Sequence, residues 1–201
     1  MGLTTDSLQR LNRNVWVLIG DGNKPVRMLE LGCQNIYDNS FPNVTYGMVA
    51  KDYFKAIPGL EHTSWDITGC QCSEKVDLRE PVDIKKTGQF DIITDYGTTE
   101  HIEGNYYMAQ KNIHDLCKMG GYRFHEIPKT GHWIGHGFNY VTIEFFTALA
   151  KDNGYEIIEL TEHFALGNIT DGCLICCVMK KVKDVKFVSE KKFNTYDVRS
   201  S

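Results

Sequence analysis

Short apolar runs alternate along the chain with segments whose apolar residues recur every three or four positions. The runs predict buried strands, and the recurring positions predict helices that pack one face on a core. The predicted strands are 26–32, 62–69, 75–78, 90–97 and 122–128. The predicted helices are 5–19, 48–57, 102–119 and 140–152. Two further apolar segments, 155–164 and 172–182, are predicted to be successive strands.

This alternation of strand and helix predicts a parallel sheet with helices on both faces. Right-handed crossovers make such a sheet doubly wound, and the short link between the last two strands predicts an antiparallel hairpin at one edge. We therefore expect an α/β three-layer sandwich, as a single domain over 1–201 with its core in 26–182. The charged segment 183–201 is expected to lie on the surface or fray.

The composition of the chain argues against some classes of binding partner. The chain has 201 residues, 42% of them hydrophobic and 24% charged, which is ordinary for a globular domain. The net charge of −4 argues against a nucleic-acid partner, because phosphates favour a basic face. No apolar run approaches the roughly 20 residues of a membrane span, and the first residues carry no apolar core of a signal peptide. We expect a cytoplasmic protein without a membrane partner, and the sequence leaves the oligomeric state open.

The seven cysteines include two groups that invite a zinc interpretation. These are Cys70 with Cys72, and Cys173 with Cys176 and Cys177. Their spacing matches no standard zinc pattern, and the second group lies in an apolar run that predicts a strand. Free cysteine is a common core residue. We predict that Cys173, Cys176 and Cys177 are reduced and mostly buried, and that no zinc is bound.

The segment 90–101 carries the strongest functional signal. Its apolar half predicts a buried strand, and polar residues crowd together directly afterwards, namely Asp95, Thr98, Thr99, Glu100 and His101. Ligands of open α/β sheets bind outside the carboxyl ends of the strands, so this cluster predicts a ligand site. The alternative is that Thr98 or Thr99 only caps the next helix. A cap does not require the acidic residues and a histidine together.

Acidic residues recur at the predicted strand ends, as Glu30, Asp66, Asp77 and Asp95. In a parallel sheet these ends share one edge. Carboxylates there suit a ligand with ribose hydroxyls, an adenine amine and a positive centre, because they accept hydrogen bonds and supply negative charge. The alternative is that each acid caps a helix or a turn.

Five motifs resemble, in order and spacing, those of the class I, seven-stranded, Rossmann-like S-adenosylmethionine-dependent methyltransferases. They are VRMLELGC at 26–33, WDITG at 65–69, VDL at 76–78, GQFDIITDYGTTEH at 88–101 and KMGGYRFHEIP at 118–128. The resemblance implies S-adenosylmethionine as cofactor. It also implies cofactor contacts from Glu30, Gly32, Gln34, Asp66, Ile67, Asp77, Leu78, Asp95 and Gly97, with Asp66 on the ribose and Asp77 near the adenine.

The glycine-rich loop of that family is altered here. Gly32 is followed by Cys33, Gln34 and Asn35, where the family has glycines at alternate positions that let the backbone approach the cofactor. We expect Gln34 to compensate by hydrogen bonding. The altered loop also supports an alternative, a methyltransferase fold that binds a ligand without catalysis. A nicotinamide-dependent enzyme is a third hypothesis, and the absence of a GxGxxG pattern counts against it.

Methyl transfer to a small-molecule hydroxyl or carboxyl group, such as that of a sugar, requires an aligned acceptor and gains from a base. The candidate bases are His101, His132 and His136, with Glu100 orienting one of them. We expect His101 and at least one of the other two to border the methyl end of the cofactor. Two histidines and a glutamate could also hold a metal ion. We favour the base and expect no metal, because ligand spacing across two loops matches no standard pattern.

Overall fold

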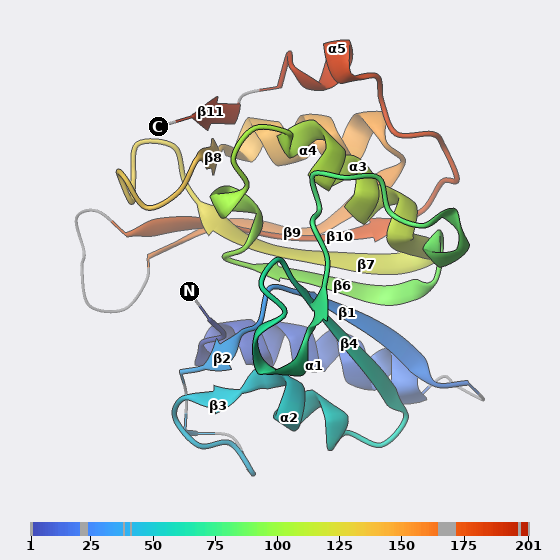
Figure 1. Ribbon diagram of the computed structural model, residues 1–201, viewed down its shortest axis with the longest axis vertical. Coiled ribbons are helices and arrows are strands. Elements are labelled where there is room, and N and C mark those ends of the chain that lie inside the picture. The colour runs from blue at the N-terminus through green and yellow to red at the C-terminus, as the bar shows by residue number, and fades with distance from the viewer. Residues whose placement is uncertain are drawn as a thin grey trace.

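The computed structural model describes residues 2–20, 24–37, 39–40, 42–164, 172–196 and 198–200. Seven strands of this described part form one sheet, in the order β5-β4-β1-β6-β7-β10-β9 (Figure 1). Their bounds are β1 Val26–Leu31, β4 Leu60–Asp66, β5 Glu74–Lys75, β6 Phe90–Tyr96, β7 Cys117–Pro128, β9 Tyr155–Phe164 and β10 Cys173–Lys181. Neighbouring strands from β5 to β7 run parallel, whereas β10 runs antiparallel between β7 and β9. The predicted sheet and its C-terminal hairpin are confirmed.

Helices cover both faces of the sheet, which confirms the three-layer prediction (Figure 1). On one face lie α1, Thr5–Gly20, and α2, Ala50–Lys55; on the other lie α3, Tyr106–Leu116, and α4, Ile143–Asp152. The remaining elements are short: β2 Asn35–Ile36, β3 Met48–Val49, η1 Cys70–Cys72, η2 Ile84–Lys86, η3 Thr99–His101, β8 Asn139–Val141, α5 Glu190–Phe193 and β11 Val198–Ser200. Among the described residues, no helix is long and apolar enough to cross a membrane.

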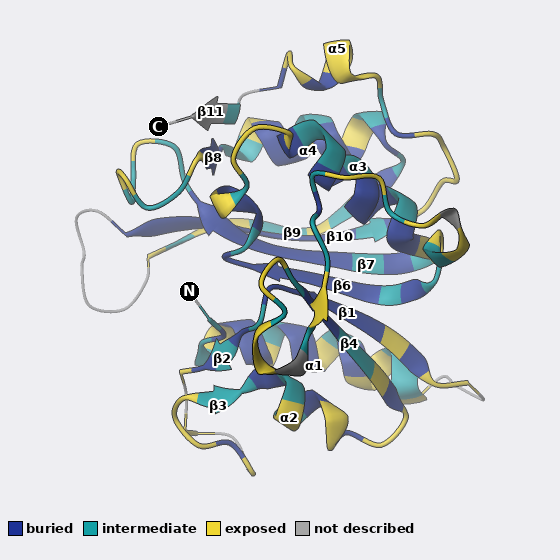
Figure 2. Cartoon of the chain, viewed as in Figure 1, coloured by how far each residue is buried: buried dark blue, intermediate teal, exposed yellow. Residues whose placement is uncertain are grey.

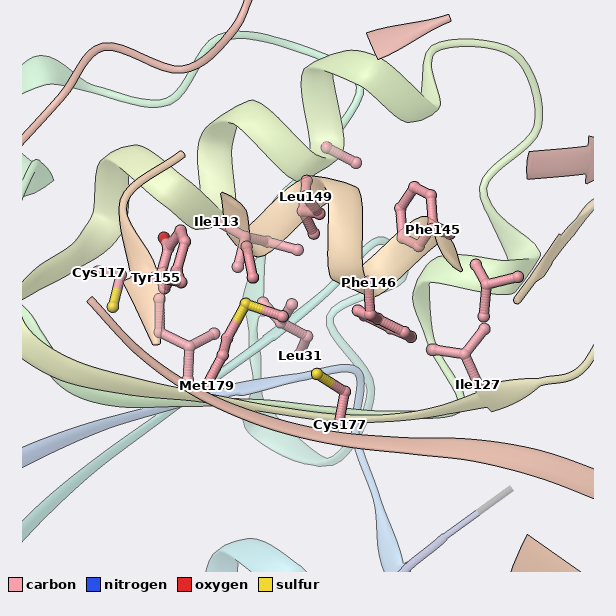
Figure 3. Packing of buried hydrophobic residues seen from close by; sticks show 14 of the residues in the cluster. Leu31, Ile113, Cys117, Ile127, Phe145, Phe146, Leu149, Tyr155, Cys177 and Met179 are labelled. Atoms are coloured by element: carbon pink, nitrogen blue, oxygen red, sulfur yellow. The ribbon is translucent and has the colours of Figure 1, made fainter. Parts of the chain in front are cut away.

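Two hydrophobic clusters form because successive strand residues face opposite sides of the sheet. On β1, Met28 packs in the cluster beneath α1, and Leu29 packs in the cluster beneath α3 and α4. The central strands are therefore buried along most of their length (Figure 2). Figure 3 shows the second cluster, in which Ile113 of α3 and Leu149 of α4 lie over Met179 of β10.

The cysteines of β10 follow the same alternation. Cys173, Cys176 and Cys177 are fully buried free thiols, and Cys177 packs among the apolar residues beneath α4 (Figure 3). Their predicted burial is confirmed. They are core residues of a central strand, which explains why their spacing resembles no metal-binding pattern.

The helix predicted over 102–119 is shorter at both ends. It begins after Asn105, whose side chain accepts a hydrogen bond from the Met108 amide, and ends at Leu116. Gly121 does not end the helix but belongs to the strand. A Cβ atom at Gly121 would lie 2.9–3.1 Å from three backbone carbonyl oxygens, so only glycine fits where β7 meets β6.

Two other predicted helices begin later than expected, because each is preceded by a short strand. The helix predicted over 48–57 is α2, preceded by β3, and the helix predicted over 140–152 is α4, preceded by β8. At α4 the Thr142 side chain accepts a hydrogen bond from the Phe145 amide and caps the helix. The predicted third strand is also displaced, since β5 ends at Lys75 and Asp77 lies just beyond it.

Of the two alternatives expected for the C-terminal segment, the described residues from 183 to 196 fit the first, since most of them are exposed at the surface, but the segment is docked on the helices and is not frayed. Phe187, Phe193 and Tyr196 are buried against the outer side of α3 and α4, in the same cluster as Phe145. The Tyr196 hydroxyl also donates a 2.9 Å hydrogen bond to the Asp152 carboxylate. The segment is rich in charged residues, so its sequence did not indicate that these three aromatic side chains pack against the helices.

We expect Tyr196→Phe to lower the free energy of unfolding by about 1–2 kcal/mol, because it removes this hydrogen bond to a charged group. Denaturant unfolding followed by circular dichroism measures the change. Lys191→Ala, on an exposed residue of the same segment, is the control and should have little effect. Equal stability of the Tyr196 variant and the parent would show that this segment is not docked in solution.

Candidate functional site

A pocket of about 410 Å³ lies at the carboxyl ends of β1, β4 and β6, within the roughly 300–1,000 Å³ usual for ligand pockets. These ends lie on one edge of the sheet, toward the left in Figure 1. The pocket is lined by Gly32, Cys33, Gln34, Trp65, Asp66, Ile67, Val76, Asp77, Leu78, Arg79, Gly97, Thr98, His101, Ile102, Glu103 and Phe138. It therefore brings together Gly32, Gln34, Asp66, Ile67, Asp77, Leu78, Gly97 and His101 of the sequence-predicted site.

Gly32 makes the turn that ends β1, with a φ of +76°. A Cβ atom there would lie 2.4 Å from the Thr98 hydroxyl and 2.7 Å from the Gln34 amide nitrogen. Both the backbone conformation and the space therefore require glycine. The Gly32 amide donates a 2.7 Å hydrogen bond to the Trp65 carbonyl, which ties the turn to the end of β4.

Gln34 joins the loops that follow β1 and β6. Its side-chain amide donates hydrogen bonds to the Leu31 carbonyl (3.3 Å) and the Thr98 hydroxyl (3.0 Å). Thr98 in turn donates a 2.8 Å hydrogen bond to the Leu31 carbonyl. In place of further glycines, the loop after Gly32 is thus held by a side-chain bridge at the floor of the pocket.

The two acids on the β4 side of the pocket differ in their surroundings. Partial burial raises the pKa of Asp66, but hydrogen bonds from the amide and hydroxyl of Thr68 outweigh it and hold the pKa below its usual value. Asp77 forms a two-point ion pair with Arg79, at 3.0 Å and 2.7 Å, which lowers the pKa of Asp77. Both carboxylates are therefore ionised at neutral pH, and that of Asp77 is already shared with a guanidinium group.

Glu30 and Asp95 do not line the pocket, although the sequence predicted that both contact the cofactor. Glu30 is buried on the α1 and α2 side of the sheet, where its Oε2 lies 3.3 Å from Nε2 of His62. Asp95 is fully buried, and its Oδ2 accepts a 2.7 Å hydrogen bond from the Thr99 hydroxyl and lies 2.9 Å from Nδ1 of His125. Asp95 thereby holds the turn that carries the polar residues after β6.

Three of the four predicted catalytic residues form one group, the Glu100–His101–His136 cluster. The Oε1 atom of Glu100 lies 3.6 Å from Nε2 of His101 and 3.8 Å from Nε2 of His136, and the two rings are 4.8 Å apart. Burial, with a smaller effect of the Asp95 charge, raises the pKa of Glu100 to about 8. Burial and the neighbouring His136 lower the pKa of His101, and burial lowers that of His136.

The loop between β7 and β8 is shaped to bring His136 to Glu100. The Tyr140 hydroxyl accepts hydrogen bonds from the His136 and Gly137 amides and donates one to the Trp133 carbonyl. The Phe138 amide donates a 2.7 Å hydrogen bond to the Glu100 carbonyl. At Gly137 a Cβ atom would lie 2.8 Å from that carbonyl oxygen, so the close approach requires glycine.

His132 lies outside the cluster, although it belongs to the same loop. Its ring packs edge-on against Phe164 of β9, with the centroids 6.3 Å apart. Of the two histidines of this loop, His136 is the one that lies beside His101, and a position of both at the methyl end of the cofactor stays a prediction. Trp133 packs against His136, with 5.4 Å between ring centroids, and Phe138 reaches the pocket wall.

A scan against protein-family models finds no match, and a search of curated proteins finds none either. Solved structures do resemble the chain. The N-methyltransferase NodS from Bradyrhizobium japonicum, in complex with S-adenosyl-L-homocysteine, matches with a TM-score of 0.58 and 14% identity, over 90% of this chain and 89% of that one. The chain has the fold of the class I S-adenosylmethionine-dependent methyltransferases.

Two further structures show how varied proteins of this methyltransferase fold are. The 1,6-didemethyltoxoflavin-N1-methyltransferase from Burkholderia thailandensis, with its substrate and S-adenosylhomocysteine bound, matches with a TM-score of 0.51 and 15% identity, over 88% of this chain and 85% of that one. The [4+2]-cyclase SpnF matches with a TM-score of 0.59 and 13% identity, over 88% and 81%. At such identities the likeness concerns the fold alone.

In this methyltransferase fold the pocket has walls that sequence reasoning missed. Thr98 holds the Gly32 turn, Arg79 pairs with Asp77, and Ile102 adds an apolar surface beside His101. Thr98 lies in the polar segment after β6, but its bond to the β1 loop is long-range. For Arg79 the available signal was its position two residues after Asp77, which suits a local ion pair.

Proposed function

We propose that this chain is an S-adenosylmethionine-dependent methyltransferase that acts on a hydroxyl or carboxyl oxygen of a small molecule. The observation that carries the proposal is the pocket built on the Gly32 turn, in a fold whose neighbours NodS and the toxoflavin enzyme were crystallised with S-adenosylhomocysteine. The proposal includes a cytoplasmic location and no nucleic-acid or membrane partner, as composition suggests.

The position of the pocket supports the cofactor assignment. Strands β4 and β5 lie on one side of β1, and β6 and β7 lie on the other, so the strand order reverses between β1 and β6. Open α/β sheets bind ligands in the crevice at this switch point. The loops after β1, β4 and β6 all contribute to the pocket wall there.

The residues present fit an adenosyl group. Asp66 offers an ionised carboxylate for ribose hydroxyl groups, and Gly32 brings the backbone to the pocket wall without a side chain. Apolar atoms of Trp65, Ile67, Val76 and Leu78 provide surfaces for an adenine ring. Asp77 accepts hydrogen bonds from Arg79, so an adenine amine there would share an acceptor with that side chain.

The strand order also suggests which end of the pocket receives the acceptor. Asp66 and Asp77 follow β4 and β5, so an adenosine on them would point its sulfur end across Gly32 toward β6. His101 and Phe138 line that opposite end. An acceptor bound there would meet the Glu100–His101–His136 cluster and an aromatic wall that excludes water.

When bound, S-adenosylmethionine supplies a methyl group already activated on a sulfonium sulfur. The tasks left to the protein are to align the acceptor and to stabilise its oxygen as it loses a proton. We assign both tasks to His101. Glu100 and His136 would assist by contacting either the acceptor oxygen or the His101 ring. His132 faces Phe164, and we assign it no chemical step.

Two observations support a second candidate function. The altered loop after Gly32, and the likeness to a protein named as a [4+2]-cyclase, favour a chain that binds a cofactor-like ligand without transferring its methyl group. Thermal shift separates both functions from a nicotinamide-dependent enzyme, because a ligand that binds only the folded state raises its stability. Release of S-adenosylhomocysteine during turnover separates the two functions from each other. S-adenosylhomocysteine should raise the melting temperature and NAD should not. Stabilisation by NAD alone would contradict both functions.

The proposed ribose contact gives a direct test of the cofactor site. Asp66→Ala should weaken S-adenosylhomocysteine binding more than about tenfold, because charge-assisted hydrogen bonds are lost. Isothermal titration calorimetry measures the affinity. Glu61→Ala, on an exposed residue of the same strand, is the control and should bind like the parent. Unchanged affinity of the Asp66 variant would remove Asp66 from the site.

A further inference from the structure

The Glu100–His101–His136 cluster has a feature that a base and its orienting carboxylate do not require. A carboxylate that orients one imidazole contacts one ring and leaves the other ring nitrogen to the substrate. Here the same oxygen atom, Oε1 of Glu100, faces Nε2 of both His101 and His136. The three possible ligand atoms lie within 4.8 Å of one another, so they converge on one point.

Two of the three side chains at this point carry buried polar atoms that have no hydrogen-bond partner among the described residues. Glu100 is fully buried, and in this described part neither of its carboxyl oxygens makes a hydrogen bond, nor does the buried Nε2 of His136. Buried polar atoms in proteins are nearly always paired, because an unpaired group costs several kcal/mol. Two of these atoms, Oε1 of Glu100 and Nε2 of His136, face the point beside the His101 ring, and they indicate a site for a positively charged ligand.

We propose that Glu100, His101 and His136 bind a divalent transition-metal ion. Two imidazole nitrogens and one carboxylate suit Zn²⁺, Fe²⁺, Mn²⁺ or Co²⁺ and leave coordination positions open for other ligands. Metal–ligand bonds of about 2.0–2.2 Å place neighbouring ligand atoms about 3.0–3.6 Å apart. The 3.6 Å and 3.8 Å from Glu100 to the two histidines are close to this spacing, whereas the set as a whole spans 4.8 Å, so the two imidazole rings must move closer together to complete the site.

The surrounding chain holds the three ligands in place. Thr99, bonded to Asp95 through both its amide and its hydroxyl, fixes the turn that carries Glu100 and His101. The Tyr140 hydroxyl fixes the backbone of His136, and Gly137 allows that loop to touch Glu100. Such support is what keeps metal ligands oriented.

The ion would lie at the acceptor end of the pocket, because His101 belongs both to the cluster and to the pocket wall. A bound divalent ion orients an oxygen ligand and lowers the pKa of its hydroxyl group. This catalytic consequence rests on the proposed methyl transfer, whereas metal binding itself does not. The bound ion would then take the place of the free histidine base that the sequence favoured.

The test is metal binding by the full chain, freed of any tag and treated with a chelator. Titration calorimetry with Zn²⁺ should give one equivalent, and Co²⁺ should give the visible absorption bands of a bound ion. Glu100→Gln and His136→Asn should each weaken binding more than about tenfold, since even residues that only support metal ligands contribute about 10–100-fold. His132→Asn, in the same loop but outside the cluster, is the matched control and should bind like the parent.

Equal affinity in the parent and either ligand variant would overturn the proposal, as would loss of binding in the His132 control. His136 lies in a partly exposed loop, so its variant tests the proposal even where Glu100→Gln fails to fold. Calorimetry with S-adenosylhomocysteine on the same samples separates the two proposals. Metal binding without S-adenosylhomocysteine binding would refute the proposed function alone, and the reverse would refute the metal site alone.

Discussion

Replacement of His101 by alanine should lower turnover about 10²–10⁴-fold while leaving the affinity for S-adenosylhomocysteine within about twofold. In the proposed mechanism, His101 belongs to the cluster that activates the acceptor, whether its ring takes a proton or holds a metal ion. It lies at the β6 end of the pocket, away from the acids on the β4 side. Its loss should therefore affect the transition state far more than cofactor binding.

Turnover is measured as release of S-adenosylhomocysteine, with acceptors found by screening small hydroxyl and carboxyl compounds. Calorimetry on the same preparations measures cofactor affinity. His163→Ala is the control, because His163 lies near Asp6, outside the cluster and the pocket. A His101 variant that loses cofactor affinity and keeps its turnover would place His101 at the wrong end of the site.

Gly32→Ala should weaken S-adenosylhomocysteine binding at least about a hundredfold. The new methyl group would lie 2.4 Å from the Thr98 hydroxyl and 2.7 Å from the Gln34 amide, so it must displace the bridge that joins the loops after β1 and β6. The shift would open the floor of the pocket. Gly32→Ala would remove both the close approach of the backbone to the cofactor and the Gln34–Thr98 bridge that supports it. We therefore expect a larger loss of affinity than for Asp66→Ala, which removes one side-chain contact.

A matched control separates this effect from backbone strain. Gly47 has a similar φ of +83°, but a Cβ atom there would meet nothing within 4 Å, so Gly47→Ala carries the strain without the collision. Backbone strain should cost both variants about 1–2 kcal/mol of stability, and the collision should cost the Gly32 variant more. Only the Gly32 variant should lose cofactor binding. Thermal unfolding and calorimetry report the two quantities. Equal cofactor affinity in both variants would show that the Gly32 turn does not hold the cofactor.

Local patterns in the sequence determined the architecture. Leu8, Leu11 and Val15 recur at helical spacing, and they are the buried face of α1. The apolar runs of β1 and β6 are buried on both sides, as a parallel central strand requires. Because periodicity depends only on neighbouring residues, it can be identified without knowledge of the tertiary structure.

The ends of the helices and strands, and the directions in which their side chains point, could be determined only from the tertiary structure. The helix before β7 ends at Leu116, and the next residue, Cys117, is extended and pairs with Phe90 of β6. Glu30 and Asp95 do lie near the carboxyl ends of the predicted strands, but they face the histidines His62 and His125 instead of the pocket. An acidic residue at a strand end can be identified in the sequence. The direction of its side chain, toward the pocket or toward the core, depends on the neighbouring strands and helices.

The candidate site was likewise determined partly by the sequence and partly by the tertiary structure. The sequence by itself identified the motif that carries Glu100 and His101, because polar residues crowd together directly after an apolar strand, and it identified the unusual loop with His132 and His136. Only the tertiary structure selected His136 over His132. That choice depends on β6 and β7 being neighbours, on the Tyr140 hydroxyl, and on a glycine at 137. These are contacts between segments far apart in the chain, and no local pattern encodes them.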